Sequence, residues 1–253
     1  MLRMLVQKLF KGHCEDPLTR RAMQYRRGRL EPFPKISKRD LPVHITEIYR
    51  KCSHEFINTL GDPFKDLNEQ ELQYIFCFVI SHIVFPYGKT ISSTAFDDLL
   101  DAEALDCSNF GVLSTYLSRL CASGAEDHIS LSFVGWDGGI IGNHQMVFLK
   151  RKNGELSIIL DPCIGLIANK ADFDSVASGK PIHIDNIIVF SDREYLESSR
   201  INVIKALIGG LFKPSDLLYY FDGMEHYLNH YGDPRFWPTP GAVFWNKVRA
   251  QSG

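Results

Sequence analysis

Residues 142–162 read GNHQMVFLKRKNGELSIILDP, and Asn153-Gly154 near the middle of this stretch decides how it folds. Both residues tolerate the positive φ angles of a type I′ turn, so Asn-Gly between two apolar runs predicts a tight β-hairpin. A two-residue loop also fixes the register of the two strands. Lys152 pairs with Glu155, and every other pair of the hairpin follows from that one.

This register brings an imidazole and a carboxylate together. It places His144 opposite Cys163 and Asp161 opposite Met146. His144 and Asp161 are then diagonal neighbours on one face of the ladder, with Cα atoms about 7–8 Å apart, which a hydrogen bond between the side chains can span. A slip of one residue would put them on opposite faces. Either residue alone is more typical of a core histidine or of a strand-ending Asp-Pro turn.

A helix is predicted to begin at Cys107. Asp106 is suited to cap it, Gly124 is suited to end it, and apolar residues recur between them at the spacing of one buried face. A cysteine on the first turn lies beside unpaired backbone N–H groups and the positive end of the helix dipole, which favour the thiolate. Alone, Cys107 is more typical of a small buried apolar residue. A thiol, an imidazole and a carboxylate together are the parts of a nucleophilic acyl-transfer site.

At these residues the chain resembles the transglutaminase-like superfamily, part of the wider papain-like group of cysteine enzymes. Residues 106–110, 143–147 and 160–162 are similar to its nucleophile block, its His-bearing strand and its Asp-Pro close. Residues 72–87 resemble the helix that precedes the nucleophile helix, and the resemblance covers about residues 60–192. It implies an α+β, papain-like fold in which the nucleophile helix packs on an antiparallel sheet.

The resemblance also implies a catalytic triad of Cys107, His144 and Asp161. Cys107 would attack an amide or thioester carbonyl, His144 would carry the proton, and Asp161 would orient the imidazole. The acyl group would then pass to an amine or to water, with no cofactor and no metal. The chain has Met146 where the family often has an aromatic residue. Gln73 and Asn143 are candidate side-chain donors for the oxyanion hole.

The superfamily also contains members without activity, so the fold alone does not decide the reaction. The alternative function is a non-catalytic interaction module that keeps the fold. Such a module would bind partners through a basic N-terminal arm and the aromatic tail at residues 234–240. An intact triad argues against it, because a binding protein has no need of all three residues.

Composition sets limits on the class of protein. A chain of 253 residues suits one large domain or a domain with appendages, and a net charge of −2 gives no general attraction to nucleic acid. The six cysteines lack CxxC spacing, which fits a reducing compartment. No apolar run approaches the roughly 20 residues that span a bilayer. Residues 1–10 are too broken by polar residues for a signal peptide, so the cytoplasm is the expected location.

Three regions are expected along the chain: a basic arm at residues 1–40, the catalytic core at residues 41–192, and a helical extension at residues 193–253 that packs on the core. The arm could contact a membrane surface or serve as a strap with scattered ion pairs, and we favour the strap. No membrane partner is therefore expected by default, and the oligomeric state is left open. Helices are predicted at residues 43–60, 69–84, 194–211 and 215–231, and strands at residues 130–136, 140–151, 155–160 and 186–190.

Two further patterns have weaker interpretations. His226 and His230 have the spacing of a metal-binding pair, but no HExxH pattern or third ligand accompanies them, so a surface or core pair is expected. An acidic stretch over residues 97–106 contains no basic residue. It fits a solvated loop, and it would also attract a cationic substrate such as an amine.

Overall fold

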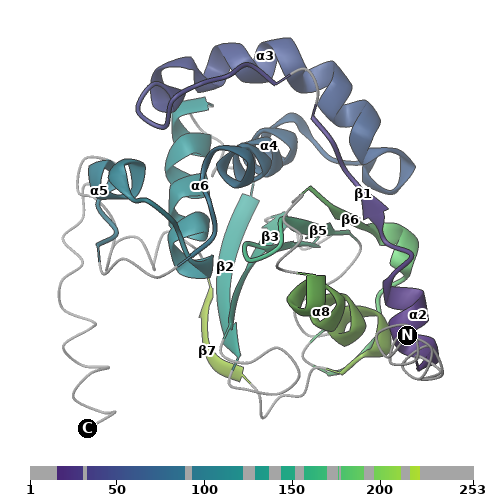
Figure 1. Cartoon of the computed structure of the whole chain (residues 1–253). Helices are drawn as coiled ribbons and strands as arrows, with labels where there is room; N and C mark the ends of the chain where they lie inside the picture. Colours follow the sequence, from purple (N-terminus) through teal and green to yellow (C-terminus); the bar gives the residue numbers. More distant parts are fainter. Residues whose placement is uncertain are drawn as a thin grey trace, which may run out of the picture.

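The structure is a computed structural model of the chain, and it describes residues 16–30, 33–88, 93–121, 129–136, 144–151, 157–169, 176, 178–190, 197–211 and 217–222. These residues form a mixed helix and sheet structure (Figure 1). Its helices are α2 (Pro17–Ala22), α3 (Leu41–Leu60), α4 (Glu69–Val84), α5 (Phe96–Asp101), α6 (Cys107–Cys121) and α8 (Glu197–Gly209).

One sheet runs through the middle of the molecule. Its strands are β1 (Arg26–Arg27), β2 (Ile129–Trp136), β3 (His144–Arg151), β4 (Ser157–Asp161), β5 (Leu166–Ala168), β6 (Ile187–Val189) and β7 (Leu217–Asp222). Across the described residues the sheet has seven strands in the order β1-β6-β5-β4-β3-β2-β7. Neighbouring strands are antiparallel except for β1, which runs parallel to β6.

Helices cover both faces of this sheet, and alternate residues of β3 and β4 divide between two hydrophobic clusters. Val147, Leu149, Ile158 and Leu160 pack with α3, α4 and α6. Met146, Phe148 and Ile159 pack on the other face with α8. Figure 1 shows α3, α4 and α6 on one side of the sheet and α8 with α2 on the other. Burial on both faces explains why these strands read as continuous apolar runs rather than as alternating ones.

The register of the hairpin is the predicted one. Val147 pairs with Leu160, Phe148 with Ile159, and Lys150 with Ser157, as a two-residue turn at Asn153-Gly154 requires. The turn itself lies outside the described residues, as do Gly124, Asn143, His226, His230 and the aromatic tail. This register determines which side chains of β3 and β4 lie on the same face of the sheet. His144, at the start of β3, and Asp161, at the end of β4, therefore meet at the same end of the sheet.

Most predicted elements are confirmed where they are described. Helices α3, α4, α6 and α8 and strands β2, β3, β4 and β6 lie where the sequence predicts them, with ends shifted by a few residues. The helix predicted at residues 215–231 is wrong over β7, which forms an edge strand paired with β2. Residues 217–221 form a short apolar and aromatic run, which suits an edge strand as well as a helix turn. Strands β1 and β5 were not predicted.

The described part of the basic arm lies along the folded core. Helix α2 packs on α8, and β1 extends the sheet beside β6. The Arg26 guanidinium donates to the Leu60 carbonyl at 2.7 Å, and the Lys38 ammonium donates to the Ala102 carbonyl at 2.6 Å. Arg39 forms an ion pair with Asp101 of α5. These contacts are of the kind that a strap makes; the strap stays the favoured prediction, with attachment to a membrane surface as its alternative.

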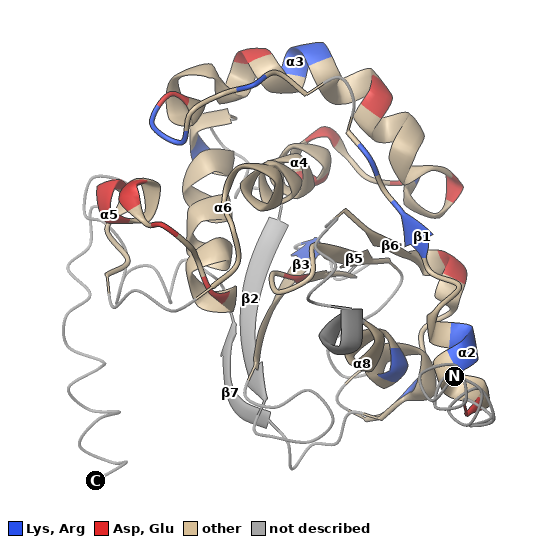
Figure 2. Ribbon diagram, in the orientation of Figure 1, with Lys and Arg blue, Asp and Glu red and all other residues tan. Residues whose placement is uncertain are grey.

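Basic and acidic residues both occur along the described elements (Figure 2). Figure 2 shows acidic residues gathered on α5, and basic and acidic residues interspersed along α3. The acidic stretch predicted as a loop is partly helical, since α5 includes Asp97, Asp98 and Asp101. None of the described helices is both long enough and apolar enough to cross a bilayer. Location in the cytoplasm stays a prediction.

Candidate active site

Cys107 is the first residue of α6, as predicted. The Asp106 carboxylate caps the helix, because its Oδ1 accepts hydrogen bonds from the Asn109 backbone N–H at 2.9 Å and from the Ser108 hydroxyl at 2.7 Å. A capped N-terminus keeps the first-turn N–H groups aligned, and the helix dipole there favours an anion. The side chain of Cys107 is half-buried, so the sulfur lies at the margin of the core.

Helix α6 is held in place by α4. The Tyr74 hydroxyl lies 3.1 Å from the Thr115 hydroxyl, and both groups are buried. Nearer to Cys107, the His82 ring stacks on the Phe110 ring with centroids 4.3 Å apart. The nucleophile candidate is therefore positioned by side-chain packing between two long helices and not by a free loop.

His144 and Asp161 form the hydrogen-bonded pair that the register predicts. The imidazole Nε2 lies 2.9 Å from Asp161 Oδ2, and the two residues are 6% and 0% exposed. The second carboxylate oxygen, Oδ1, accepts a hydrogen bond from the Cys163 backbone N–H at 2.8 Å. Because both oxygens have partners, the carboxylate is fixed in rotation, and it fixes the plane of the imidazole in turn.

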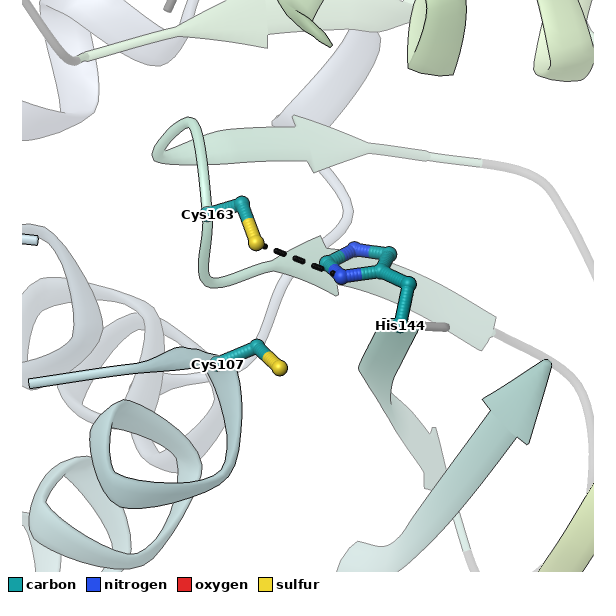
Figure 3. A group of neighbouring side chains, drawn as sticks. All are labelled: Cys107, His144 and Cys163. Atoms are coloured by element: carbon teal, nitrogen blue, oxygen red, sulfur yellow. Dashed lines mark hydrogen bonds between the residues drawn. The ribbon is translucent and has the colours of Figure 1, made fainter. Parts of the chain in front are cut away.

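A second thiol faces the other imidazole nitrogen. Cys163 Sγ lies 3.2 Å from His144 Nδ1, and Figure 3 shows Cys107 and Cys163 projecting toward this imidazole from two different elements. The Tyr87 hydroxyl lies 3.0 Å from Cys163 Sγ. The two sulfur atoms and a ring nitrogen of His144 all lie within 4.8 Å of one another. Both cysteine side chains therefore lie beside the same imidazole.

Sequence reasoning did not predict Cys163 or Tyr87 as site residues. The hairpin register did place Cys163 opposite His144, and that was the signal available for it. Tyr87 lies at the end of the segment that resembles the family's preceding helix, and nothing in the sequence marked it. It reaches the site through an isolated parallel bridge to Leu105, two residues before Cys107.

The electrostatics of the cluster separate the two thiols. A hydrogen bond from Cys163, and after it the His144 imidazole, lowers the pKa of Cys107 to about 6 although burial opposes this shift. The hydrogen bond to Cys107 and burial raise the pKa of Cys163 well above its usual range. The hydrogen bond between the two thiols, with the His144 imidazole, therefore favours the thiolate at Cys107 and the protonated thiol at Cys163.

The imidazole carries the balancing charge. Burial favours the neutral ring, but the Asp161 carboxylate and after it Cys107 raise the pKa of His144 to about 10. A thiolate and an imidazolium thus face each other between these two pKa values. Burial also raises the pKa of Tyr87, so its hydroxyl remains a hydrogen-bond donor at neutral pH. The arrangement holds an activated sulfur, a proton donor and a fixed carboxylate in one place.

Gln73, one of the two oxyanion-hole candidates, lies away from this cluster. Its side-chain amide donates to Glu69 at 3.2 Å, within the first turns of α4. Glu71 of the same turns is bonded to Arg151, at the opposite end of β3 from His144. The other candidate, Asn143, lies outside the described residues.

Two other features are separate from the cluster. A cavity of about 600 Å³ lies between α3 and the arm at Leu30 and residues 33–40, and neither the predicted triad nor Cys163 lines it. Within the described part of the chain, Cys107, His144 and Cys163 are the group of His, Cys, Asp or Glu side chains placed to hold a metal ion. His226 and His230 lie outside that part.

Comparison with known proteins adds no relative. No family model matches the chain, and neither a curated protein nor a solved structure matches it. The likeness to the transglutaminase-like superfamily therefore stays a prediction from the sequence. Any functional assignment depends on the chemistry of the residues that meet at Cys107, His144 and Asp161.

Proposed function

We propose that this chain is a cysteine enzyme of the transglutaminase-like, papain-like type, which transfers or hydrolyses acyl groups through a covalent acyl-enzyme on Cys107. The observation that supports it most strongly is the chain of contacts at the cluster. A sulfur with a pKa of about 6 at a helix N-terminus faces an imidazole whose Nε2 is bonded to a buried carboxylate. Nucleophile, acid–base group and orienting group are the three parts that acyl transfer needs.

The reaction begins with attack of the Cys107 thiolate on an amide or thioester carbonyl. A bond forms between Sγ and the carbonyl carbon, and the electron pair of the C=O bond moves to oxygen. When the tetrahedral intermediate collapses, the His144 imidazolium gives its proton to the departing amine or thiol. The neutral imidazole then takes a proton from the incoming amine or water, which attacks the thioester and releases Cys107 as a thiolate.

Two groups are proposed to stabilise the oxyanion. One is the backbone N–H of Cys107, at the start of α6. The other is the Tyr87 hydroxyl, which stays protonated because burial raises its pKa. A donor aimed at the developing negative charge contributes several kcal/mol of transition-state stabilisation. The carbonyl would then lie between the first turn of α6 and the ring of Tyr87.

Burial of the His144–Asp161 pair favours catalysis over a non-catalytic interaction module. The Asp161 carboxylate is fully buried and His144 nearly so. Buried charged groups cost free energy even when they are paired, and well-packed apolar residues of similar size are often neutral or stabilising in their place. A binding module would have no use for this arrangement, whereas a cysteine enzyme uses each of its members.

Alkylation of the thiols across pH tests the proposal. Iodoacetamide should label Cys107 with a midpoint near its pKa of about 6, and Cys163 only at much higher pH. Cys52, whose pKa is raised by burial, is a matched control on α3. Site-resolved mass spectrometry reads the three rates in one sample. Equal reactivity of Cys107 and Cys52 at pH 7 would contradict the proposal.

Capture of the acyl-enzyme tests the second half of it. A short-chain acyl thioester should add one acyl group to the wild-type chain, seen in its intact mass, and none to Cys107→Ala. Adding a primary amine should release the amide if the chain is a transferase, and release of the free acid alone would assign it to hydrolysis. An acyl group that remains on Cys107→Ala would show that the thioester reacts elsewhere.

A further inference from the structure

The acyl-transfer mechanism uses one thiol, but the structure brings two to the same imidazole. Cys163 Sγ lies 3.2 Å from His144 Nδ1. It follows β4 directly, and the proposed reaction gives it no chemical step. Its position is nevertheless fixed on three sides by the Asp161 carboxylate, the Tyr87 hydroxyl and the imidazole. A thiol held in this way is expected to have a chemical function of its own.

Two sulfur donors and one imidazole nitrogen form a ligand set for a borderline-soft divalent ion. Tetrahedral Zn²⁺ takes sulfur at about 2.3 Å and nitrogen at about 2.0–2.1 Å, which sets its ligand atoms roughly 3.5–3.8 Å apart. The Cys107, His144 and Cys163 donor atoms already lie within 4.8 Å of one another. Closing the set around an ion requires these atoms to approach one another by about 1 Å at most.

The surroundings of His144 match those of a metal-binding histidine. When the ring is neutral, the Asp161 carboxylate accepts a hydrogen bond from the Nε2–H. The lone pair of Nδ1 then faces the two sulfurs. A carboxylate behind a ligating imidazole fixes its tautomer and raises its basicity. This orientation comes from the hairpin register and is independent of the distances between the three donors.

We propose that Cys107, His144 and Cys163 bind one Zn²⁺ ion, with the fourth position open to water or a small ligand. Each sulfur binds as a thiolate and the imidazole binds through its Nδ1 lone pair. Any proton that a donor carried is released to solvent. The site is assigned from its donors and does not rest on the proposed acyl transfer. It has one consequence for that reaction: zinc withdraws electron density from the Cys107 thiolate, so the metal-bound chain should form the acyl-enzyme much more slowly.

Zinc affinity of single variants tests the site. The full chain, reduced and metal-free, is titrated with Zn²⁺ against a chromophoric chelator. Wild type and Cys52→Ala should each bind one ion with the same affinity. Cys107→Ala and Cys163→Ala should bind at least about ten-fold more weakly, and Asp161→Asn roughly 10–100-fold more weakly, because it alters the outer shell of the site. Wild-type affinity in Cys163→Ala would overturn the proposal.

Cobalt provides a second measurement that does not depend on affinity. Co²⁺ in place of Zn²⁺ should give a thiolate-to-metal charge-transfer absorption, weaker in each single-cysteine variant because one sulfur donor is missing. Near-UV circular dichroism of each variant checks that the fold is retained. A cobalt spectrum without this absorption in the wild-type chain would exclude coordination by sulfur and overturn the site.

The two proposals fail in different ways. Zinc binding by a metal-free chain that forms no acyl-enzyme would support the metal site and contradict the proposed enzyme. If the chain forms an acyl-enzyme but its zinc affinity is unchanged by Cys163→Ala, the proposed enzyme is supported and the metal site is contradicted. If both proposals hold, zinc should protect Cys107 from iodoacetamide, and a chelator should restore its labelling.

Discussion

The imidazole of His144 and the carboxylate of Asp161 are hydrogen-bonded across β3 and β4, with 2.9 Å between Nε2 and Oδ2. The two residues are diagonal neighbours of an antiparallel ladder, at the end of the sheet where α6 begins. The same carboxylate also holds the turn that carries Cys163. Asp161 therefore positions the imidazole and the second thiol together.

Asp161→Asn tests the orienting role of this carboxylate. We expect the rate of acyl-enzyme formation to fall by up to about 10⁴-fold, because an amide in this position favours the wrong imidazole tautomer. Single-turnover acylation with a thioester measures it. Thermal unfolding of the variant is the control, since a loss of rate caused by misfolding would also lower the Tm. A rate within a few-fold of wild type would remove Asp161 from the mechanism.

The rate should depend on pH with two inflections. Below a pH of about 6 the Cys107 thiolate is protonated, and above about 10 the His144 imidazolium loses the proton that the leaving group needs. We therefore expect kcat/KM to rise through the first pKa and fall through the second. In His144→Ala the alkylation midpoint of Cys107 should move upward, because His144 helps to lower its pKa. An unchanged midpoint would show that the imidazole does not act on this thiol.

Tyr87→Phe tests the proposed oxyanion donor. Removing the hydroxyl should lower kcat by about 10²–10³-fold, the usual cost of losing one such donor. KM should change little if the hydroxyl acts only on the tetrahedral intermediate. Tyr74→Phe is a matched control, because it removes a buried hydroxyl from the contact between α4 and α6 and none from the cluster. A similar loss of kcat in both variants would indicate a packing effect.

Arg151→Met should destabilise the fold by about 3–5 kcal/mol, because it leaves a buried carboxylate without its partner. Glu71 is 1% exposed and accepts from Arg151 Nε at 2.7 Å and from Arg151 Nη2 at 2.9 Å. Urea unfolding measures the loss. The double variant Glu71→Gln with Arg151→Met should be more stable than Arg151→Met alone, since it buries no unpaired charge. Equal stability of the two variants would mean that the unpaired Glu71 carboxylate carries no cost.

Leu30→Ala tests whether the arm belongs to the core. Leu30 is 6% exposed and packs in the same hydrophobic cluster as α3, α4 and α6, so the variant should lose about 2–5 kcal/mol of unfolding free energy. Met23→Ala, in the same arm, removes a side chain that is 52% exposed and should change stability by less than about 0.5 kcal/mol. Equal small effects would favour an arm that is only loosely attached.

Local signals in the sequence predicted the parts of the site that local structure determines. Asn153-Gly154 set the pairing of β3 with β4, and hence the contact between His144 and Asp161. Asp106 and the helical spacing after it predicted where α6 begins. These features depend on neighbours in the chain, so one sequence is enough to find them.

The remaining parts depend on contacts between distant segments. The hairpin register placed Cys163 opposite His144, but its approach to Cys107 depends on how α6 packs beside the turn after β4. Strands β1 and β5 are two and three residues long and are defined by their pairing partners more than by their own composition. β7 forms at the open edge of β2, which the periodicity of residues 217–222 does not reveal. No sequence pattern within these segments indicates which strand each of them pairs with.

Strand β3 is anchored at both of its ends. Its first residue, His144, is tied to Asp161, and its last, Arg151, is tied to Glu71 at the start of α4. A strand fastened at only one end can slip in register, and a slip of one residue carries its side chains to the other face of the sheet. Here sliding would break two ion pairs, formed by residues about 23 Å apart, seven residue steps along the extended strand. The contact between Arg151 and Glu71, far from the proposed reaction, thus helps to keep the reactive imidazole in place. Natural variation at these two residues should be tolerated only when both change together.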